Sequence, residues 1–330
     1  MAKQRLDTLL TDLNLCASRQ QAQGLIRAGK VTVNHQVVDK PGTEVNIGAT
    51  IQVAARSRFV SRGGEKLAKA LEVFGISVAG RICLDGGIST GGFTDCLLQA
   101  GAARVYGIDV GYGQVDWGLR NDPRVVLKER SNLRYLTAAE VYGNSPPPAP
   151  PYQGGEQEIA PLCEGGESEI APHCESGGQE LAGLPVGGIY ADLGVLDLSF
   201  ISLTKVLPAL WELLAAPREA VLLVKPQFEV GRERVGKKGV VRDTAAQADA
   251  IFQVLEAAVA LGWEQRGLTW SPLLGPAGNI EYLLWLGTDS EGRSKENAVG
   301  EGVVKERIAQ VAQAAVRELV KPTPNLSLNK

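Results

Sequence analysis

The sequence predicts an α/β protein, with a doubly wound parallel sheet and a smaller N-terminal α+β domain. Over residues 63–290, apolar segments of strand length alternate with amphipathic helical segments, the pattern of strands joined by helices. Residues 1–55 have a different order, with two helical patterns before two alternating strands. The chain contains no apolar run near the roughly 18 residues needed to cross a bilayer, so we expect no membrane partner.

The small domain at residues 1–55 begins with two short amphipathic helices, and Gly29 is a natural C-terminal stop for the second. Two strands follow, the first with a turn at Asn34. Residues 56–62 are the predicted linker to the larger domain. We expect the helices at residues 5–13 and 18–29, and the strands at residues 30–38 and 50–55.

The larger domain supplies seven predicted strands, and the last two follow each other as a late hairpin. A doubly wound sheet with this ending is typical of methyltransferases that use S-adenosylmethionine (SAM). A final helix at residues 303–319 lies in the C-terminal segment 291–330, which ends in a polar tail. The strands are expected at 81–85, 104–109, 124–128, 189–198, 220–226, 262–271 and 279–287, and the helices between them at 93–101, 202–214 and 245–262.

Residues 144–188 interrupt the larger domain with a segment rich in Pro, Gly and Glu. It contains the repeat GGEQEIAPLCE followed by GGESEIAPHCE. Such a segment buries too little apolar surface to offset its ordering entropy, so we expect a disordered insertion. The repeat brings Cys163, His173 and Cys174 near each other, but three potential ligands in an acidic segment are more often incidental. We therefore expect no metal.

Charge is distributed unevenly along the chain, although the formal net charge is only −3. Residues 1–70 contain eleven Lys or Arg against five Asp or Glu, whereas residues 144–188 contain seven Glu and no Lys or Arg. A basic N-terminal region suggests an anionic partner. Five cysteines without close spacing, and an N-terminus without the apolar core of a signal peptide, favour the cytoplasm. Only two histidines occur, which argues against a Ser–His–Asp triad.

The segment LDGGISTGGFTDCLL at residues 84–98 has the layout of a nucleotide site, with a strand, an acid, a glycine-rich turn and a helix. It lacks the Gly-Lys-Ser/Thr of a P-loop and the G-x-G-x-x-G spacing of a dinucleotide site. Asp109 ends the next strand, where an acid can accept hydrogen bonds from a ribose. This layout favours SAM over NAD and leaves both open. The candidate cofactor-binding residues are Asp85, Gly86, Gly87, Ser89, Thr90, Gly91, Gly92, Phe93, Asp109 and Asn132.

Four ionisable residues are predicted near the carboxyl ends of the strands, where doubly wound sheets bind their ligands. Asp197 and Lys225 interrupt very apolar strands at that end, and Pro226 holds Lys225 extended. Lys66 lies on the helix that leads into the sheet, and Glu281 lies in the segment GNIEYLLWL. Each alone could be a solvated lysine or a helix-capping acid, and that alternative is weakest for Asp197 and Lys225.

Several motifs together resemble the TlyA, or hemolysin A-like, ribosomal RNA 2′-O-methyltransferases, which are related to FtsJ-type RNA ribose methyltransferases. They include SRGGEKLAKAL, DGGISTGGFT, LDLSFISL, LVKPQFEVG and SPLLGPAGNIEYLLWL. The N-terminal segment RLDTLLTDLNLCASRQQAQGLIRAGKVTVNHQVVDKP resembles the S4 RNA-binding domain of that family. The chain departs from the family in Gly86, where alanine is more usual, and in the insertion at residues 144–188.

The resemblance implies SAM as the methyl donor and cytidines of ribosomal RNA, in one or both ribosomal subunits, as the acceptors. It also implies that Lys66, Asp197, Lys225 and Glu281 form a Lys–Asp–Lys–Glu catalytic tetrad. In the S4-like domain it favours phosphate contacts by three basic residues, with two polar residues shaping the surface. These RNA-binding candidates are Arg5, Arg19 and Lys30, with Ser18 and Asn34.

A 2′-hydroxyl occurs in RNA and not in DNA, so DNA is not an expected partner. A neutral lysine could remove the hydroxyl proton, and we assign this role to Lys225. Lys66 would position or polarise the hydroxyl, while Asp197 and Glu281 would orient the amines and the ribose. The alternatives are a membrane-lytic hemolysin, a non-catalytic RNA-binding ribosome assembly factor and, least favoured, an NAD-dependent oxidoreductase. The missing membrane span and the complete tetrad argue against the first two, and the lack of a catalytic His or Tyr-x-x-x-Lys pair argues against the third.

Overall fold

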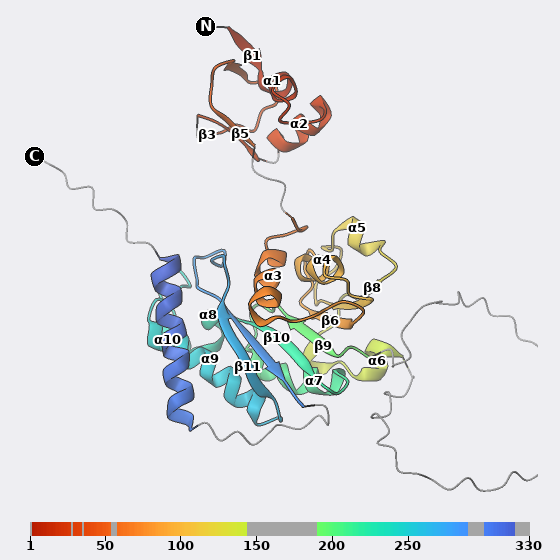
Figure 1. Cartoon of the computed structure of the whole chain (residues 1–330), viewed down its shortest axis with the longest axis vertical. Helices are drawn as coiled ribbons and strands as arrows, with labels where there is room; N and C mark the ends of the chain where they lie inside the picture. Colours follow the sequence, from red (N-terminus) through yellow and green to blue (C-terminus); the bar gives the residue numbers. More distant parts are fainter. Residues whose placement is uncertain are drawn as a thin grey trace, which may run out of the picture. The chain divides into compact units, whose positions relative to one another are not determined.

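The computed structural model describes residues 2–27, 29–34, 36–53, 58–143, 190–289 and 300–320. The chain divides into two compact units, Met1–Arg58 and Phe59–Lys330, which are drawn in Figure 1 and considered separately here. The predicted insertion at 144–188, with Cys163, His173 and Cys174, lies outside the described residues, as does the polar tail. Within the described ranges, no helix is long and apolar enough to cross a membrane, and no metal-binding group of His, Cys, Asp and Glu occurs.

The N-terminal unit contains the two predicted helices, packed around a small apolar core of residues such as Leu6, Leu10 and Ile26. The backbone turns at Gly29 and Asn34 are confirmed, with φ angles of 65° and 51°. The structure also contains two short strands, β1 and β4, which pair with each other. The sequence did not predict them, because polar three-residue strands show no apolar–polar alternation. The elements are β1 Lys3–Arg5, α1 Leu6–Asp12, α2 Arg19–Arg27, β2 Val31–Val33, β3 Gln36–Val37, β4 Glu44–Asn46 and β5 Ile51–Val53.

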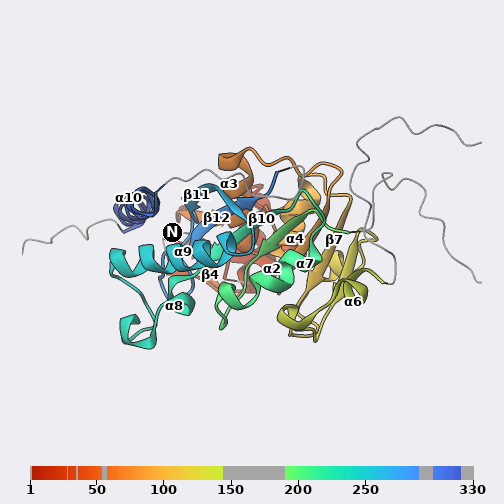
Figure 2. The same cartoon turned by 90° about the horizontal axis from the view of Figure 1, so that it is seen from below.

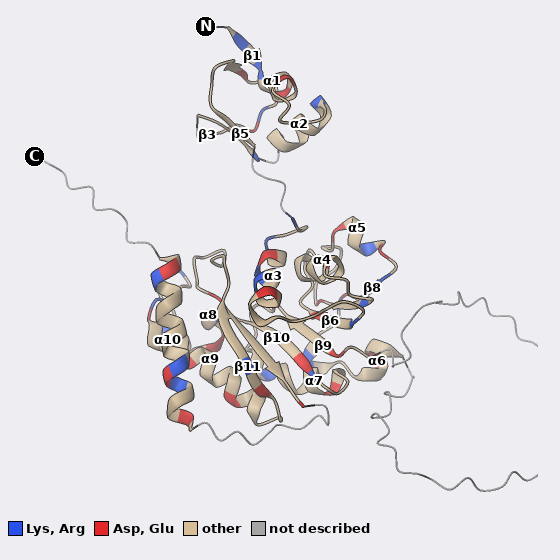
Figure 3. Ribbon diagram, viewed as in Figure 1, with Lys and Arg blue, Asp and Glu red and all other residues tan. Residues whose placement is uncertain are grey.

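A buried carboxylate organises the polar side of this unit, where Figure 3 shows an acidic position on α1 and basic positions on β1 and α2. Asp7 is fully buried and accepts hydrogen bonds from Arg5, Arg19 and Gln23 at 2.9–3.1 Å. The Arg5 guanidinium holds the pKa of Asp7 well below its usual range, against the opposing effect of burial. Two of the predicted RNA-binding arginines are therefore also held in place by this acid.

Replacing Asp7 with alanine is expected to loosen the N-terminal unit, because the carboxylate joins β1, α1 and α2. The pKa of Asp7 is lowered in the folded state, so its contribution to stability is present above its ordinary value of 3.8 and is lost as the pH falls below it. Hydrogen exchange of the α1 amides should be about tenfold faster or more in the Asp7→Ala variant at neutral pH. The difference should shrink on acidification, and unchanged exchange at neutral pH would contradict this role.

The second unit is built on a seven-stranded sheet with the order β11-β12-β10-β9-β6-β7-β8. All neighbouring pairs are parallel except β10–β12 and β11–β12, so the predicted late hairpin is confirmed. The strand order changes direction at β6 and β9, and doubly wound sheets bind ligands at such a switch point. The strands are β6 Ile82–Gly86, β7 Arg104–Ile108, β8 Val125–Lys128, β9 Leu193–Leu196, β10 Glu219–Val224, β11 Glu264–Trp270 and β12 Tyr282–Gly287.

Helices cover both faces of this sheet (Figure 2). Alternate strand residues explain the two layers, since Leu222 and Val224 of β10 face the core with α7 and α9, while Val221 and Leu223 face the core with α3 and α4. The long helix α10 packs on α9 and β11. The helices are α3 Gly63–Phe74, α4 Gly92–Gln99, α5 Trp117–Arg120, α6 Ala138–Tyr142, α7 Leu207–Leu213, α8 Pro226–Glu229, α9 Thr244–Val259 and α10 Glu301–Leu319, with the 3₁₀ turns η1 Leu133–Tyr135, η2 Leu203–Lys205 and η3 Arg232–Arg234.

Two boundaries differ from the sequence-based expectations. The second unit starts at Phe59, inside the predicted linker 56–62, because the Phe59 ring is buried in the α3–α4 core. The single helix predicted at 202–214 is divided into η2 and α7. Pro208 lacks an amide hydrogen and is accommodated in the first turn of a new helix, so α7 restarts at Leu207.

Candidate active site

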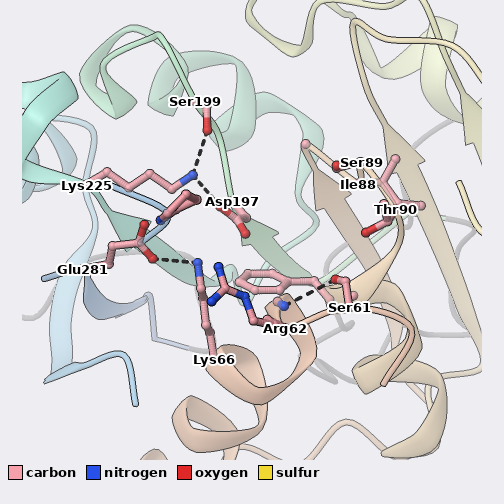
Figure 4. Close-up of a pocket in the computed structure, with 15 residues that line it drawn as sticks. Ser61, Arg62, Lys66, Ile88, Ser89, Thr90, Asp197, Ser199, Lys225 and Glu281 are labelled. Atoms are coloured by element: carbon pink, nitrogen blue, oxygen red, sulfur yellow. Dashed lines mark hydrogen bonds and ion pairs between the residues drawn. The ribbon is translucent and has the colours of Figure 1, made fainter. Parts of the chain in front are cut away.

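A cavity of about 490 Å³ lies at the carboxyl edge of the sheet, beside β6, β9 and β10 (Figure 4). It has a glycine-rich wall on one side and a group of charged side chains on the other. The residues that line it are Ser61, Arg62, Gly63, Lys66, Gly87, Ile88, Ser89, Thr90, Gly92, Phe93, Asp197, Ser199, Lys225, Pro276 and Glu281. All four members of the predicted tetrad are therefore brought together by the fold.

The tetrad consists of two lysine–carboxylate pairs. Lys66 Nζ lies 2.6 Å from Glu281 Oε2, and Lys225 Nζ lies 2.6 Å from Asp197 Oδ1. Glu281 is 1% exposed and both lysines are buried, while the Asp197 side chain is 23% exposed and open to the cavity. Because the charges are balanced in pairs, no member of the tetrad is left as an uncompensated buried charge.

The pairing of Asp197 with Lys225 follows from the parallel register of β9 and β10. Leu222 lies opposite Leu196, so the residues that follow the two strands emerge side by side at the same edge. Lys225 is the residue just before α8, and its amine also donates a hydrogen bond to Ser199 Oγ at 2.9 Å. Two oxygen partners thus fix the direction of the Lys225 amine.

Glu281 reaches the same edge by a different route. It immediately precedes β12, and because β12 is antiparallel, its beginning lies at the carboxyl ends of the other strands. The backbone carbonyl of Glu281 accepts a hydrogen bond from Ser271 N at 2.8 Å, which closes the loop between β11 and β12. The strand predicted at 279–287 begins later, at Tyr282, which leaves Glu281 free to face Lys66 on α3.

The glycine wall is shaped by close backbone contacts. Gly87 has a φ angle of 86°, and a Cβ atom there would lie 2.8 Å from the carbonyl oxygen of Asp197. A Cβ atom on Gly92 would lie 2.2 Å from Ser61 Oγ and 2.9 Å from Gly64 N. The turn between β6 and α4 therefore lies directly against both the Asp197 loop and the start of α3, and only glycine fits at these two contacts.

Asp85 lies beneath this wall and is completely buried. Its Oδ2 atom accepts a hydrogen bond from Thr94 Oγ1 at 2.6 Å, whereas Oδ1 has no partner in the described part of the chain. Burial raises the pKa of Asp85 to about 7, and the Thr94 hydrogen bond only partly opposes this effect. A buried carboxylate with an unpaired oxygen beneath a ligand wall is suited to interact with a positively charged ligand.

The predicted cofactor-binding residues divide into three groups. Five of them line the cavity: Gly87, Ser89, Thr90, Gly92 and Phe93. Asp85 and Gly86 end β6 and Gly91 precedes α4, and none of the three lines the cavity. Asp109 and Asn132 also lie outside the lining and have local backbone partners: Asp109 accepts hydrogen bonds from Ser89 N at 2.8 Å and Gly111 N at 2.7 Å, and Asn132 accepts one from Arg134 N at 3.1 Å.

Sequence reasoning missed several residues of the cavity wall, namely Ser61, Arg62, Gly63, Ile88, Ser199 and Pro276. A signal existed for some of them, since Ser61, Arg62 and Gly63 belong to the motif that contains Lys66, and Ser199 follows Asp197 by two positions. Which of these side chains faces the cavity depends on contacts between distant loops, which a motif does not reveal.

The loop after Asp197 also carries an exposed aromatic residue that the sequence did not single out. Phe200 is 92% exposed and has a φ angle of 64°, an uncommon backbone conformation for a bulky residue. Its ring lies 5.2 Å from that of Phe228 on α8. Buried Glu229 anchors the same loop, because its carboxylate accepts hydrogen bonds from Ser202 Oγ at 2.6 Å and Leu203 N at 2.9 Å. These contacts anchor the loop that follows Asp197, in which Phe200 is the residue after the cavity-lining Ser199.

The predicted RNA-binding residues of the N-terminal unit are all exposed. Arg5 and Arg19 are half exposed while paired with Asp7. Ser18 accepts a hydrogen bond from Gln21 N at 3.2 Å and so caps the start of α2, and Asn34 accepts one from Thr50 N at 3.0 Å, which joins its turn to the residue before β5. Lys30 follows the Gly29 turn, and its amine forms no hydrogen bond or ion pair within the described residues.

The mostly parallel seven-stranded sheet and the polar cavity at its carboxyl edge define a methyltransferase with the fold typical of SAM-dependent enzymes. The FtsJ-like methyltransferase family matches residues 59–288, and the S4 domain family matches residues 4–51. The chain therefore belongs to the FtsJ-like methyltransferases, in the TlyA family, in which an S4 domain precedes the catalytic domain.

Three similar proteins illustrate this relationship. The 16S/23S rRNA (cytidine-2′-O)-methyltransferase TlyA of Mycobacterium tuberculosis is 43% identical over 289 residues, which cover 87% of this chain and 91% of the relative. YqxC of Bacillus subtilis, named as a candidate rRNA methyltransferase, is 39% identical over 318 residues, or 96% of this chain and 95% of the relative. A solved structure from Streptococcus thermophilus, named as a candidate hemolysin, has a TM-score of 0.61 and 35% identity, with 96% of this chain and 98% of that chain covered.

Proposed function

We propose that this enzyme transfers a methyl group from SAM to the ribose 2′-hydroxyl of cytidines in ribosomal RNA. The observation that carries the proposal is the pair of lysine–carboxylate contacts facing one cavity beside the glycine wall. The name of the Mycobacterium tuberculosis relative supports the acceptor, since it specifies cytidine 2′-O-methylation of 16S and 23S rRNA. Ribosomal subunits are the proposed partners, and the cytoplasm, where they occur, is the proposed location.

The glycine wall and Asp85 fit SAM chemically. Gly87 and Gly92 allow a ligand to approach the backbone closely, and the buried Asp85 carboxylate at the end of β6 would favour a cationic ligand near this wall. Each Asp109 oxygen can accept a further hydrogen bond beyond its backbone partner, so Asp109 could hold a ribose hydroxyl. When bound, SAM supplies an electrophilic methyl group on a sulfonium.

In the proposed reaction, the side chains at the charged end of the cavity prepare the ribose hydroxyl. Lys225 would accept the 2′-hydroxyl proton as a general base, and the ribose oxygen would then attack the methyl group that bound SAM would supply, with S-adenosylhomocysteine as the leaving group. Asp197 and Ser199 aim the Lys225 amine. Glu281 fixes Lys66, which donates a hydrogen bond to the reacting oxygen. Much of the acceleration comes from holding these groups in line.

The exposed Phe200 ring gives the acceptor nucleotide a stacking surface. Single-stranded or flipped bases stack on aromatic side chains in RNA-binding sites. Phe200 lies one residue from Ser199 of the cavity wall and is held by Phe228 and by the Glu229 anchor. A base resting on Phe200 would place its ribose near Lys225. The S4 unit, with Arg5, Arg19 and Lys30, would dock the surrounding structured RNA through phosphate contacts.

The decisive experiment is transfer of labelled methyl from SAM to purified small and large ribosomal subunits, followed by mapping of 2′-O-methylated nucleotides. The expected result is label at cytidine 2′-hydroxyls of at least one subunit. Absence of label in both subunits, or label only on bases, would overturn the proposal. A liposome-leakage assay with the same preparation addresses membrane lysis, for which no leakage is expected.

SAM binding is expected to release a proton from Asp85 below neutral pH. The pKa of Asp85 is raised to about 7, so near pH 6 the carboxyl is mostly protonated, and a bound cation favours the ionised form. Calorimetry in buffers of different ionisation enthalpy should detect release of up to about one proton near pH 6 and almost none near pH 9. The Asp85→Asn variant should bind SAM without this release, and an unchanged release in that variant would assign the proton to another group.

A further inference from the structure

The charged side chains of the cavity leave one cation without a counter-charge. Five of the lining residues carry charge, and four of them form the Lys66–Glu281 and Lys225–Asp197 pairs. The fifth is Arg62, which is exposed and has neither a hydrogen-bond nor an ion-pair partner for its guanidinium among the described residues. Figure 4 shows its side chain extending into the cavity on the same side as Lys66.

Arg62 occupies a defined position on α3. It is the residue before the first turn, and Lys66 and Lys69 follow at helical spacing, so the three cations share one face. Lys66 forms an ion pair with the Glu281 carboxylate, and the Lys69 amine lies 4.8 Å from the centre of the Trp270 ring. Arg62 differs from its two neighbours because its charged group faces the cavity and has no partner in the part of the chain that the structure describes.

The proposed acceptor, an RNA strand, carries negative phosphates that could pair with the Arg62 guanidinium. A ribose 2′-hydroxyl is on the carbon next to the one that bears the 3′-phosphate, so placing the hydroxyl between Lys66 and Lys225 also brings a phosphate close by. The tetrad is neutral when all four side chains are ionised and carries one negative charge when Lys225 acts as the base, so in neither state does it have positive charge to spare for that phosphate. SAM carries an ammonium, a sulfonium and a carboxylate, so its net charge is positive. A positively charged ligand is stabilised by an anion, and not by a second cation such as Arg62.

We infer that Arg62 binds the phosphate adjacent to the acceptor ribose, and thereby selects an RNA strand whose 2′-hydroxyl is correctly placed. This inference rests on the proposed function and adds a substrate-binding residue to it. The planar guanidinium can donate two parallel hydrogen bonds to phosphate oxygens, which fixes orientation as well as charge. The contact would set the distance between the backbone of the strand and the Lys225 amine.

The test compares Arg62→Ala and Arg62→Lys with the wild-type enzyme on purified ribosomal subunits. Arg62→Ala should lower kcat/KM for the subunit by about tenfold to a hundredfold. Its affinity for SAM and for S-adenosylhomocysteine should remain within about twofold of the wild type, because the donor does not use this contact. Arg62→Lys retains the positive charge but not the two parallel N–H donors of the guanidinium, so its kcat/KM should lie between those of Arg62→Ala and the wild type.

A second readout does not require methyl transfer. Subunit affinity is measured as a function of salt in the presence of S-adenosylhomocysteine, and the slope should fall by about 0.7–0.9 in Arg62→Ala but stay near wild type in Arg62→Lys. Arg317→Ala is the matched control, since Arg317 is exposed on α10 and does not line the cavity. It should change neither the slope nor kcat/KM.

Two results would overturn the inference. One is an Arg62→Ala variant with the wild-type salt slope and wild-type kcat/KM. The other is a selective loss of SAM affinity, which would assign the guanidinium to the carboxylate of the donor. A wild-type enzyme that labels no subunit would instead remove the proposed function, while the salt slopes would still decide whether Arg62 binds phosphate.

Discussion

Replacing Lys225 with alanine is expected to lower kcat for 2′-O-methylation by about 10²–10⁴-fold, the usual contribution of a general base. SAM affinity should change little, because Lys225 lies at the charged end of the cavity and not in the glycine wall. Asp197 and Ser199 would lose their shared partner but remain partly exposed to solvent, so the fold should survive. Single-turnover methyl transfer with labelled SAM measures the chemical step directly.

Lys225→Arg separates the base role from simple electrostatics. Arginine can keep an ion pair with Asp197 but does not give up its proton in proteins, so this variant should be nearly as slow as Lys225→Ala. Lys205→Ala is the control, because Lys205 is an exposed lysine of η2 outside the cavity wall. Near-normal turnover in Lys225→Ala with intact SAM binding would show that another group takes the proton.

The second large effect is expected from Gly92→Ala. A methyl group there would collide with Ser61 Oγ at 2.2 Å and with the backbone nitrogen of Gly64 at 2.9 Å. The side chain of Ser61 can rotate, but the start of α3 must shift, and with it Lys66. We expect a loss of about 1–3 kcal/mol in the free energy of unfolding, the usual cost of overpacking.

Activity should suffer more than stability, because the shift moves a tetrad lysine relative to the cofactor wall. SAM affinity measured by calorimetry should fall by about tenfold or more, and methyl transfer should fall further. Gly302→Ala is the matched control, since nothing lies within 4 Å of a Cβ atom at that position in α10. If the Gly92→Ala variant bound SAM with wild-type affinity, the start of α3 could move away from the β6–α4 turn without changing the cofactor site, which would contradict this prediction.

The layers of the catalytic unit were predictable because its strands are buried on both faces. Val221, Leu222 and Leu223 form a continuous apolar run, and β11 and β12 form the expected hairpin. The division of the 202–214 segment into η2 and α7 was not predicted, because apolar periodicity continues through Pro208 while the backbone hydrogen bonding does not. The strands β1 and β4 were not predicted, because each is stabilised by pairing with a segment distant in the sequence and not by a local alternation of apolar and polar residues.

The candidate site was predictable to the extent that its residues end strands or belong to recognisable motifs. Asp197 and Lys225 stand out as charges at the ends of apolar strands, and the structure places their charged atoms 2.6 Å apart. Arg62 and Phe200 lie inside the motifs SRGGEKLAKAL and LDLSFISL, but the motifs alone do not single them out, because an aromatic or basic residue in a loop has no periodic signal. The roles proposed for them rest on the positive φ angle of Phe200 and on the charge balance of the cavity, which only the folded chain reveals.

The two ends of the catalytic unit's long interruption are joined by aromatic contacts. The rings of Tyr142 and Tyr190 lie 4.4 Å apart, and the Tyr142 hydroxyl donates a hydrogen bond to the Leu213 carbonyl oxygen at 2.7 Å. A connection with fixed ends can change in length at a cost that grows only logarithmically. Evolution could therefore lengthen the chain at this point without disturbing the sheet. A change in the length of the connection between Tyr142 and Tyr190 is therefore expected to leave the seven-stranded sheet in place.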